Sequence, residues 1–376
     1  MKNNRIIIAL VFAGLLSPAA KETGFCGDGF EMAAKVKKQQ NGSKSKKKSG
    51  SRVTTVYSDP ETGEWIHRAN KSIVVHRDAE GVVRAMSPFK ATAATGQKYA
   101  DALNQFAAEL RHDGVNVYSL IGPTQGAFYM PAQIEDNNDQ SIVIKEVAEY
   151  FSPLVTPIFV SDNLRKHIDE EIYNHTDHHW APLGAFYAAE EFADRLGLPF
   201  LPLEQYEADT VRNYVGSMYN FSGDVAVKNN PEEFVYYITP GDYYAEIIDY
   251  KIVNQETKEE SEKREGSIYR KFPDGSGGAY STYLGGDRST VRIVNREAPN
   301  DRRLLVVKDS FGNALAPCLI NSFEEVHIID FRYFPHNLLD YVRDNGISDL
   351  VFVNCPSIAF SQNFANRAQF LLTTEE

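Results

Sequence analysis

Three strand-like runs separated by two helical patterns, near the carboxyl end, constrain the fold of this chain more than any other feature. Residues 303–308, 325–329 and 349–353 are short apolar runs typical of strands that are buried on both faces. Helical patterns separate them, over residues 314–319 and 338–345. Because parallel strands need crossover connections, and such crossovers are right-handed, this order predicts a parallel sheet with helices on its faces.

Earlier parts of the chain add to this α/β pattern. A helical stripe over residues 99–110 precedes a buried-type strand at 115–121, and residues 143–170 have the pattern of helix, strand and helix. Residues 52–92 show a strand–turn–strand pattern instead. From about 197 to 300, Tyr, Gly, Asp and Asn residues are frequent and strand-like runs are short, which predicts a β-rich insertion or lid.

The amino terminus has the pattern of an export signal. Lys2 and Arg5 precede the apolar run Ile6 to Leu16, and small residues follow near a plausible cleavage point. This run of 11 residues is short for a membrane span, which needs about 20. A short buried helix and an N-terminal anchor are the alternatives. The Lys-rich segment that follows is typical of a solvated linker, which could lie against an anionic surface.

Charge and cysteine content narrow the function classes. The net charge is −12, with +7 in residues 1–50 and −19 in the rest, where 29 Lys and Arg face 48 Asp and Glu. An acidic body argues against nucleic-acid binding and fits neutral or partly esterified polymers. Three cysteines (Cys26, Cys318 and Cys355) cannot form a disulfide framework. We expect Cys318 and Cys355 to be buried small hydrophobes, with pairing as the alternative.

Polar residues follow each of the three carboxyl-terminal strands. Asp309 and Ser310 follow the first, Asp330 and Arg332 lie at the end of the second, and Asn354 follows the third. Because the carboxyl ends of parallel strands meet at one edge of a sheet, these groups are expected to converge. At a strand-to-helix turn the serine hydroxyl would project above the sheet, and the following backbone N–H groups could stabilise an oxyanion. A plain helix N-cap is the alternative for this serine.

The stretch Asp177-His178-His179-Trp180 places an acid, two imidazoles and an indole directly before a helix that Pro182 can begin. On an extended segment, Asp177 and His179 would share one face while His178 would point away. That arrangement suits a carboxylate that orients a general base.

Two other interpretations of this stretch stay open. Asp177 or Thr176 could serve as a helix N-cap. Alternatively, His175, His178 and His179 could bind zinc together with Asp177, although adjacent histidines rarely ligate one ion.

Together these blocks resemble the DHHW protein family, which is related to the alginate O-acetyltransferase-like branch of the SGNH (GDSL-type) hydrolase superfamily. Asp309-Ser310 and Asn354 resemble the first and third SGNH blocks, and Asp177 to Trp180 resembles an Asp-x-His-Trp motif. Further matches are Lys308 to Phe311, Asp330 to Tyr333, and Tyr283 to Asp287, in which Asp287 stands where Asn is expected. The resemblance covers about residues 95–360.

The resemblance implies a three-layer αβα, flavodoxin-like parallel sheet. The acid–histidine motif precedes the serine, so the block order is that of a circularly permuted SGNH-like domain with a β-rich insertion. The expected organisation is a signal peptide or short anchor (1–20), a Lys-rich linker (21–50), a first part of the domain (51–196), the insertion or lid (197–300) and a second part (301–376).

The same resemblance implies roles for individual residues. Ser310 would be the nucleophile, His179 the base and Asp177 the group that orients it. Oxyanion or substrate contacts would come from Arg332, Asn354, Tyr333 and Gly286, and support from His178, Trp180 and Asp309. We expect His178 to pack or hydrogen-bond beneath the site and Trp180 to lie in the core. Neither a metal nor a cofactor is expected.

Three departures from the family pattern leave alternatives open. Lys308 precedes Asp309 where a glycine is usual, and this lysine is expected to face solvent or a neighbouring acid. Arg332 stands near the place of the second-block glycine and could form an ion pair with Asp330 or Asp309 instead. Asn354 lacks the usual Gly-x-Asn-Asp frame and could simply cap its strand.

These features lead to one functional hypothesis and one alternative. The first is an exported serine esterase or O-acyltransferase that acts on O-acetyl groups of a cell-envelope or extracellular carbohydrate. The alternative is a catalytically silent carbohydrate-binding or envelope-assembly protein on the same scaffold. The expected partners are a carbohydrate or an acylated small molecule, together with a membrane surface contacted through the amino terminus, and no nucleic acid.

Overall fold

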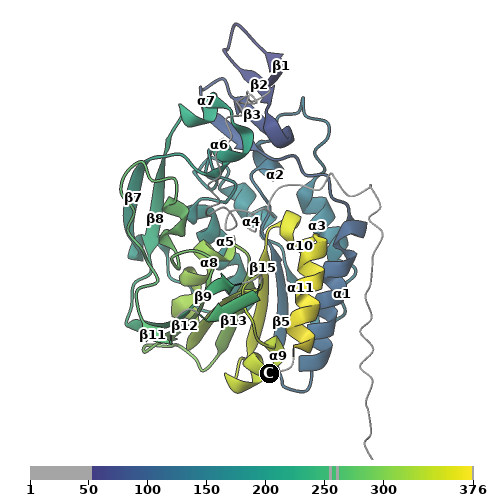
Figure 1. The fold of residues 1–376 in the computed structure, drawn as a ribbon, viewed down its shortest axis with the longest axis vertical. Coiled ribbons are helices and arrows are strands. Elements are labelled where there is room, and N and C mark those ends of the chain that lie inside the picture. The colour runs from purple at the N-terminus through teal and green to yellow at the C-terminus, as the bar shows by residue number, and fades with distance from the viewer. Residues whose placement is uncertain (1–52, 254–255, 260–261, 375–376) are drawn as a thin grey trace, which may run out of the picture.

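A computed structural model describes residues 53–253, 256–259 and 262–374, so the predicted export signal, the Lys-rich linker and Cys26 lie outside the described residues. At its centre is a nine-stranded sheet (Figure 1). Its strands are β5 (Asn116–Ile121), β6 (Val155–Ile158), β9 (Tyr243–Val253), β10 (Glu256–Glu259), β11 (Arg264–Glu265), β12 (Ser289–Asn295), β13 (Arg303–Lys308), β14 (Glu325–Asp330) and β15 (Asp349–Asn354).

The order of these strands is β10-β9-β12-β14-β13-β15-β5-β6, with β11 paired to β9. The strands from β14 to β6 are parallel, whereas β12 is antiparallel to both of its neighbours. The parallel sheet predicted from the alternating pattern is therefore confirmed. The chain order within it places β5 and β6 before β13.

Side chains of neighbouring strands explain why the fold has three layers. Val351 of β15 is paired with Tyr118 of β5, and Phe352 with Ser119. Phe352 packs against Phe106 of α1 (Ala93–Leu110), with ring centroids 5.2 Å apart. The Tyr118 ring packs against Phe192 of α5 (Pro182–Arg195) at 5.5 Å. Because successive side chains of a strand point to opposite faces, the two faces of the sheet are covered by different helices.

On one face α1 packs with α3 (Gln140–Ala148), α9 (Leu338–Asp344) and α11 (Gln362–Thr373), and α10 (Pro356–Ala359) precedes α11. On the other face α5 packs with α4 (Ser161–Lys166), α8 (Gly312–Leu315) and the 3₁₀ helix η5 (Ala316–Ser322). The single helix predicted over 314–319 is wrong in this detail, since Pro317 lacks the N–H that would continue α8. Among the described residues, no helix is both long and apolar enough to cross a membrane. Cys318 and Cys355 are buried, as predicted, and form no disulfide within the described part of the chain.

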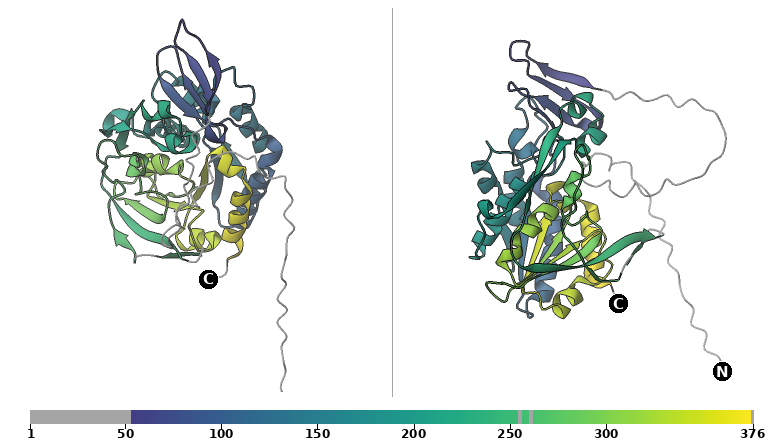
Figure 2. Two further views of the ribbon diagram at one scale, coloured as in Figure 1. Left: turned by 45° about the horizontal axis from the view of Figure 1, so that its top comes forward. Right: turned by 90° about the vertical axis from the view of Figure 1, so that its left-hand side faces the viewer.

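A separate antiparallel sheet projects from one end of the molecule (Figure 2). Its strands are β1 (Thr54–Ser58), β2 (Trp65–Arg68), β3 (Val74–Arg77) and β4 (Val83–Met86), and η2 (Asn70–Ser72) joins β2 to β3. Val75 and Ala85 of this sheet, and Ile73 just before β3, pack against Met218 of α6 (Ser217–Ser222) and Val227 of α7 (Val225–Lys228). The predicted strand–turn–strand unit is thus confirmed, and it lies against the residues that follow Gly216.

Residues 197–300 are rich in strands. After η3 (Leu203–Gln205), β7 (Glu207–Tyr214) and β8 (Glu232–Ile238) form a two-stranded sheet of their own. In contrast, β9 and β12 extend the central sheet beyond β14. A 3₁₀ helix, η4 (Ala279–Thr282), follows before β12. This region therefore contributes strands to the central sheet and also forms the separate sheet of β7 and β8.

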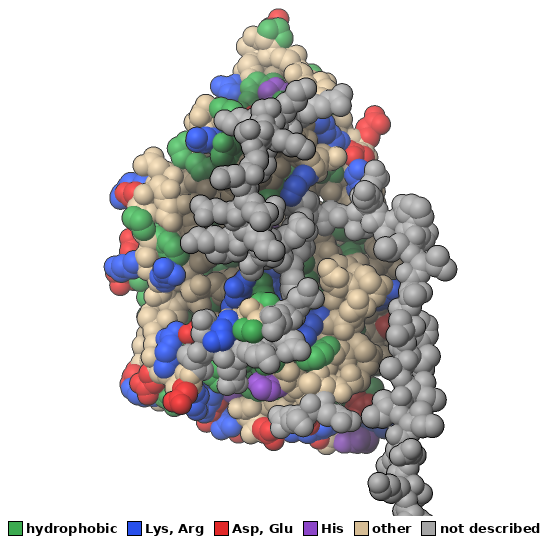
Figure 3. Space-filling view, in the orientation of Figure 1, with side chains coloured by type: hydrophobic (Ala, Val, Ile, Leu, Met, Phe, Trp, Pro, Cys, Tyr) green, Lys and Arg blue, Asp and Glu red, His purple; other side chains and the backbone are tan. Residues whose placement is uncertain are grey.

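Acidic and basic side chains are interspersed on the surface. Along the lower edge of the face in Figure 3, Lys and Arg side chains lie beside Asp and Glu side chains. Among the described residues, ion pairs of this kind include Arg264–Asp249 (2.7 Å) and Arg296–Asp242 (3.0 Å). Because exposed ion pairs add little stability, this pattern has little bearing on the fold.

Candidate active site

Ser310, His179 and Asp177 form a hydrogen-bonded row at the carboxyl edge of the sheet. The hydroxyl oxygen of Ser310 lies 2.7 Å from Nε2 of His179, and Nδ1 of the same imidazole lies 2.5 Å from Oδ1 of Asp177. Asp177 and His179 are buried. With the Nδ1 proton directed at the carboxylate, Nε2 is left to accept the proton of the serine hydroxyl. Two distant parts of the chain thus place a hydroxyl, an imidazole and a carboxylate at hydrogen-bonding distance, an arrangement that is able to activate a serine for nucleophilic attack.

The turn that carries Ser310 is built around the carboxylate of Asp309. This carboxylate accepts hydrogen bonds from the backbone N–H of Phe311 (2.9 Å) and of Cys355 (2.8 Å). Burial raises the pKa of Asp309. Because Asp309 binds the first backbone N–H groups, the Ser310 hydroxyl does not act as a helix cap and instead meets His179. Asp309 therefore supports the turn.

The backbone N–H groups after Ser310 are already engaged. Phe311 and Gly312 donate to Asp309, and Asn313 donates to the Ser310 carbonyl at 3.2 Å. The helix α8 that follows has only four residues, so these donors close its turn. The N–H groups of Phe311, Gly312 and Asn313 are thus all used within the turn.

The segment that carries both histidines is bent. An isolated bridge between Tyr173 and Trp180 closes residues 175–179 into a loop. The expectation that His178 points away from His179 is wrong, because side chains do not alternate along a bent segment. The rings of His178 and His179 lie 3.7 Å apart, centroid to centroid.

His178 supports the loop as a neutral group. Its Nδ1 lies 2.6 Å from the hydroxyl oxygen of Ser217. Burial lowers the pKa of His178 to about 3, so the imidazole carries no charge at neutral pH. This neutral side chain packs directly against the His179 ring.

Asp177 is held by residues on both sides of the loop. Its Oδ2 accepts the Ser217 N–H at 2.8 Å, and its carbonyl accepts the Gln125 side-chain amide at 3.0 Å. Burial raises the pKa of Asp177, but the interaction with His179 outweighs burial and leaves that pKa well below its usual range. The carboxylate is therefore ionised and able to stabilise a charged imidazole.

Tyr280 of η4 is a site residue that the sequence did not reveal. Its ring stacks on the His179 imidazole at 3.7 Å with an angle of 2° between the planes. Its hydroxyl donates to the Ser310 carbonyl at 2.9 Å. Tyrosine is common throughout residues 197–300, and no spacing singles this one out.

Arg332 belongs to a network of paired charges beside the serine. Its guanidinium binds both carboxylate oxygens of Asp330, at 2.8 and 2.7 Å, and one of Asp287 at 2.9 Å. Lys308 is buried and lies 3.1 Å from Asp330, so it faces an acid and not solvent. Burial opposes ionisation of Asp287, yet Arg332 and Lys308 hold its pKa well below the usual range. Two cations thus face two anions. Arg332 forms the ion pair with Asp330 that the sequence analysis gave as the alternative to a substrate contact.

Asn354 is the buried polar group of this edge that lacks a partner. Its side chain is completely buried, and neither Nδ2 nor Oδ1 has a hydrogen-bond partner among the described residues. Only its backbone carbonyl takes part in the sheet edge, accepting the Gly122 N–H at 2.9 Å. Because buried amides are normally hydrogen-bonded, the unsatisfied amide of Asn354 is an exception.

Three further residues named from the sequence are Trp180, Tyr333 and Gly286. Trp180 is fully buried, packs on Phe311 and donates its indole N–H to the Phe311 carbonyl at 3.1 Å, so it belongs to the core. Tyr333 is buried, with the guanidinium of Arg288 5.5 Å from its ring centre. Gly286 has a φ of +116°, which favours glycine in the turn before Asp287.

The ligand atoms of Asp177, His178 and His179 lie within 4.8 Å of one another, as a metal site would require. They are, however, already bonded to each other and to Ser217. His175 takes no part, because its Nε2 lies 2.6 Å from Glu171. To bind here, zinc would have to displace the hydrogen bonds that join His179 to Asp177 and His178 to Ser217.

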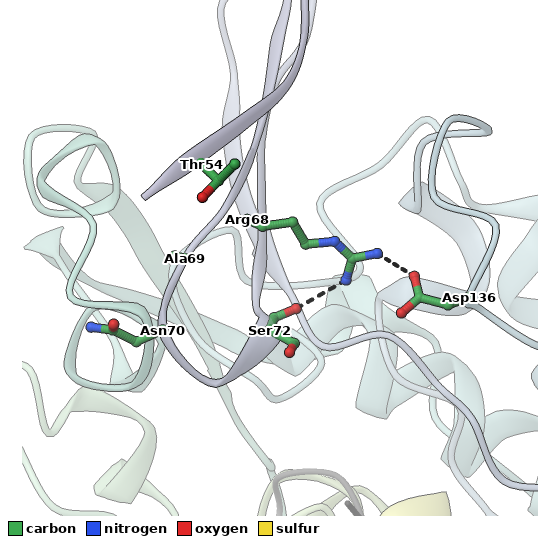
Figure 4. Close-up of a pocket in the computed structure, with 6 residues that line it drawn as sticks. All are labelled: Thr54, Arg68, Ala69, Asn70, Ser72 and Asp136. Atoms are coloured by element: carbon green, nitrogen blue, oxygen red, sulfur yellow. Dashed lines mark hydrogen bonds and ion pairs between the residues drawn. The ribbon is translucent and has the colours of Figure 1, made fainter. Parts of the chain in front are cut away.

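A hollow on the amino-terminal sheet lies apart from this chemistry (Figure 4). Arg68 crosses it, bonding to Asp136 and to the Ser72 carbonyl. The other residues that line it are Thr54, Ala69 and Asn70. None of these residues belongs to the row Ser310–His179–Asp177.

Comparison with known proteins agrees with this fold. The family model described as DHHW protein matches residues 83–329. A crystal structure of a DHHW family protein from Eubacterium siraeum is 34% identical, with a TM-score of 0.72, over 81% of this chain and 96% of that chain.

Two structures of Bacillus cereus PatB1 share the fold at lower identity. One is 22% identical with a TM-score of 0.62, over 78% of this chain and 99% of that chain. The other, with a sulfonyl adduct, is 20% identical with a TM-score of 0.61, over 78% and 97%. No curated protein matches the chain. The family model and the structure from Eubacterium siraeum together show that this chain belongs to the DHHW protein family.

Proposed function

We propose that this protein is an exported serine esterase or O-acyltransferase that acts on O-acyl groups of carbohydrate. The observation that carries the proposal is the row Ser310–His179–Asp177, with separations of 2.7 and 2.5 Å. A serine within bonding distance of an imidazole that a carboxylate orients is the arrangement used for acyl transfer.

The reaction would run in two halves. Ser310 attacks the ester carbonyl carbon while His179 takes the hydroxyl proton, and that proton leaves with the sugar alcohol. An acyl group is then bonded to Ser310. In the second half, water or another sugar hydroxyl attacks the acyl carbon and gives its proton to His179. Ser310 regains a proton as the product departs, so hydrolysis and transfer differ only in the acceptor.

The negative charge that develops on the carbonyl oxygen needs a donor. We assign this role to Asn354, because its Nδ2 is buried without a partner in the described part of the chain. Arg332 is a weaker choice because Asp330 and Asp287 already bind its guanidinium. Preorganised donors of this kind stabilise the transition state without reorganising.

Charge supports a neutral substrate. Lys308 and Arg332 are neutralised by Asp330 and Asp287, so the described site offers no unpaired cation to a uronate or a phosphate. An O-acetyl group on a neutral sugar ring suits such a site. Export to the envelope is proposed from the amino-terminal pattern alone.

Hydrolysis of 4-nitrophenyl acetate tests the proposal. Ser310→Ala should abolish nitrophenol release, whereas Ser267→Ala, at a serine on the β11 side of the sheet, should leave it unchanged. A fluorophosphonate probe should label the wild type at Ser310, as located by mass spectrometry. Activity that persists in Ser310→Ala would refute the assignment. Glycan binding without turnover or labelling would point to the catalytically silent alternative.

A further inference from the structure

The backbone of the loop that carries the acid and base is bound by one carboxylate from outside the α/β core. Glu232 is the first residue of β8. Its Oε2 accepts the His175 N–H at 2.6 Å. Its Oε1 accepts both the Thr176 N–H at 2.7 Å and the Thr176 hydroxyl at 2.5 Å. Three donors of the loop thus converge on a single side chain.

Thr176 also binds residues on the opposite side of the loop. It is fully buried, and its hydroxyl oxygen also accepts the Gly216 N–H at 2.9 Å. Its carbonyl accepts the Met218 N–H at 2.9 Å. The residue between those two, Ser217, donates its N–H to Asp177. Glu232 is therefore connected to the Asp177 carboxylate through Thr176 and the adjacent N–H groups of residues 216 and 217, of which the first binds Thr176 and the second binds Asp177.

An ionised carboxylate satisfies this arrangement, even though burial raises the pKa of Glu232. All three contacts are donors, and a carboxylate is an acceptor at both oxygens. A glutamine of the same shape would have to aim its N–H₂ group at either the His175 or the Thr176 donors. The N–H₂ group would then face another donor where a hydrogen bond now exists, and the repulsion between the two donors would shift the loop.

We propose that Glu232 is a positioning residue, which sets the place of Asp177 and His179 so that the imidazole meets Ser310. Glu232 touches none of the reacting atoms and acts through Thr176 and residues 216–218. The inference rests on the proposed function, because it assigns a catalytic purpose to this contact.

The first test compares Glu232→Gln with Glu233→Gln in the ester assay. The neighbouring Glu233 is exposed, and its contact with Arg212 is a surface pair at 3.9 Å. Because an error of about 1 Å in a catalytic group can cost about 100-fold, Glu232→Gln should lower kcat by about 10- to 100-fold. KM should stay within about twofold, and labelling of Ser310 should slow by the same factor as kcat. Glu233→Gln should match the wild type.

The second test removes the other half of the contact. Thr176→Val keeps the shape of the side chain but loses the hydroxyl, so it should reproduce the loss of kcat, whereas Thr176→Ser should restore activity. In the double variant with Glu232→Gln, the losses should be smaller than additive, because both changes break one network. If Glu232→Gln fails to fold, the pair at Thr176 decides the question.

A spectroscopic readout separates this inference from the proposed function. The proton between His179 and Asp177 should give a downfield resonance in the wild type, with or without turnover, and Glu232→Gln should shift or broaden it. If the wild type shows neither turnover nor labelling, the proposed function fails, and this resonance still tests Glu232. If the wild type is active while Glu232→Gln and Thr176→Val keep full kcat and the same resonance, the positioning role is refuted.

Discussion

Gly216 and Asp177 approach so closely that one methyl group on the glycine would overlap the carboxylate. A Cβ atom at position 216 would lie 2.4 Å from Oδ2 and 2.5 Å from Cβ of Asp177. The φ of Gly216 is −83°, which any residue can adopt, so the requirement for glycine here is space. The acid is therefore placed by contact as well as by hydrogen bonds.

Gly216→Ala should displace Asp177 and lower kcat/KM for 4-nitrophenyl acetate by about 100-fold, because triad geometry tolerates little movement. The matched control is Gly278→Ala, since a Cβ there would meet its nearest atom, in Phe272, at an ordinary 3.4 Å. That control should keep wild-type kinetics. Full activity in Gly216→Ala would show that Asp177 can move without consequence.

The ring of Tyr280 should stabilise the imidazolium that forms when His179 accepts a proton. Tyr280→Phe keeps the stack and loses the bond to the Ser310 carbonyl, so kcat/KM should fall by about fivefold. Tyr280→Leu also loses the aromatic face, which is worth up to about 2 kcal/mol beside a desolvated cation, and should cost about 30-fold. Equal losses in both variants would assign the effect to the hydroxyl instead.

Asn354 should matter to kcat and little to KM. Removing one donor from an oxyanion site costs about 100- to 1000-fold in kcat, which is the loss expected for Asn354→Ala. Asn354→Asp keeps the shape but replaces the donor with an acceptor, and it should be equally impaired. Asn366→Ala, on the exposed side of α11, is the control. A wild-type kcat in Asn354→Asp would remove this residue from the mechanism.

Acid should destabilise the fold through Glu325. Burial raises the pKa of this carboxyl, but bonds from His327 and Arg292 outweigh burial and hold the pKa at about 2. Of these two partners, Arg292 supplies the positive charge, since burial lowers the pKa of His327 and disfavours its charged form. A depressed pKa contributes stability above about pH 4.5, and that contribution is lost as pH falls towards 2.

The contribution of Glu325 should be on the order of 1–2 kcal/mol, allowing for solvent screening of the partly exposed Arg292. Urea unfolding of the wild type and Glu325→Gln at several pH values measures it. The difference between the two should be largest above pH 4.5 and should shrink towards pH 2. A difference independent of pH would rule out this titration.

Much of the fold could be predicted because its central strands are continuous apolar runs. Residues 303–308 and 349–353 form β13 and most of β15, and the polar groups after them meet at one edge. The contact between Ser310 and His179 could be predicted from the position of Ser310 at this edge, combined with the family resemblance. The prediction that these residues catalyse acyl transfer awaits the assays above.

Other parts of the site could not be predicted, for physical reasons. The contacts of Glu232 and Tyr280 depend on how residues 197–300 pack against a loop far away in sequence, and no periodicity marks either residue. The orientation of His178 was predicted from strand alternation, and the bend at 175–179 removes that alternation. Local patterns describe elements well, but they do not describe contacts between distant irregular segments.

The position of β15 also has a consequence for biosynthesis. This strand is the last of the sheet to leave the ribosome, yet it lies between β13 and β5. A nascent chain that stops before Asp349 leaves the sheet in two pieces, with β13 and its serine on one and β5 on the other. Contacts of such long sequence separation form slowly. Under the proposed function, chains truncated before Asp349 should therefore be inert in the ester assay.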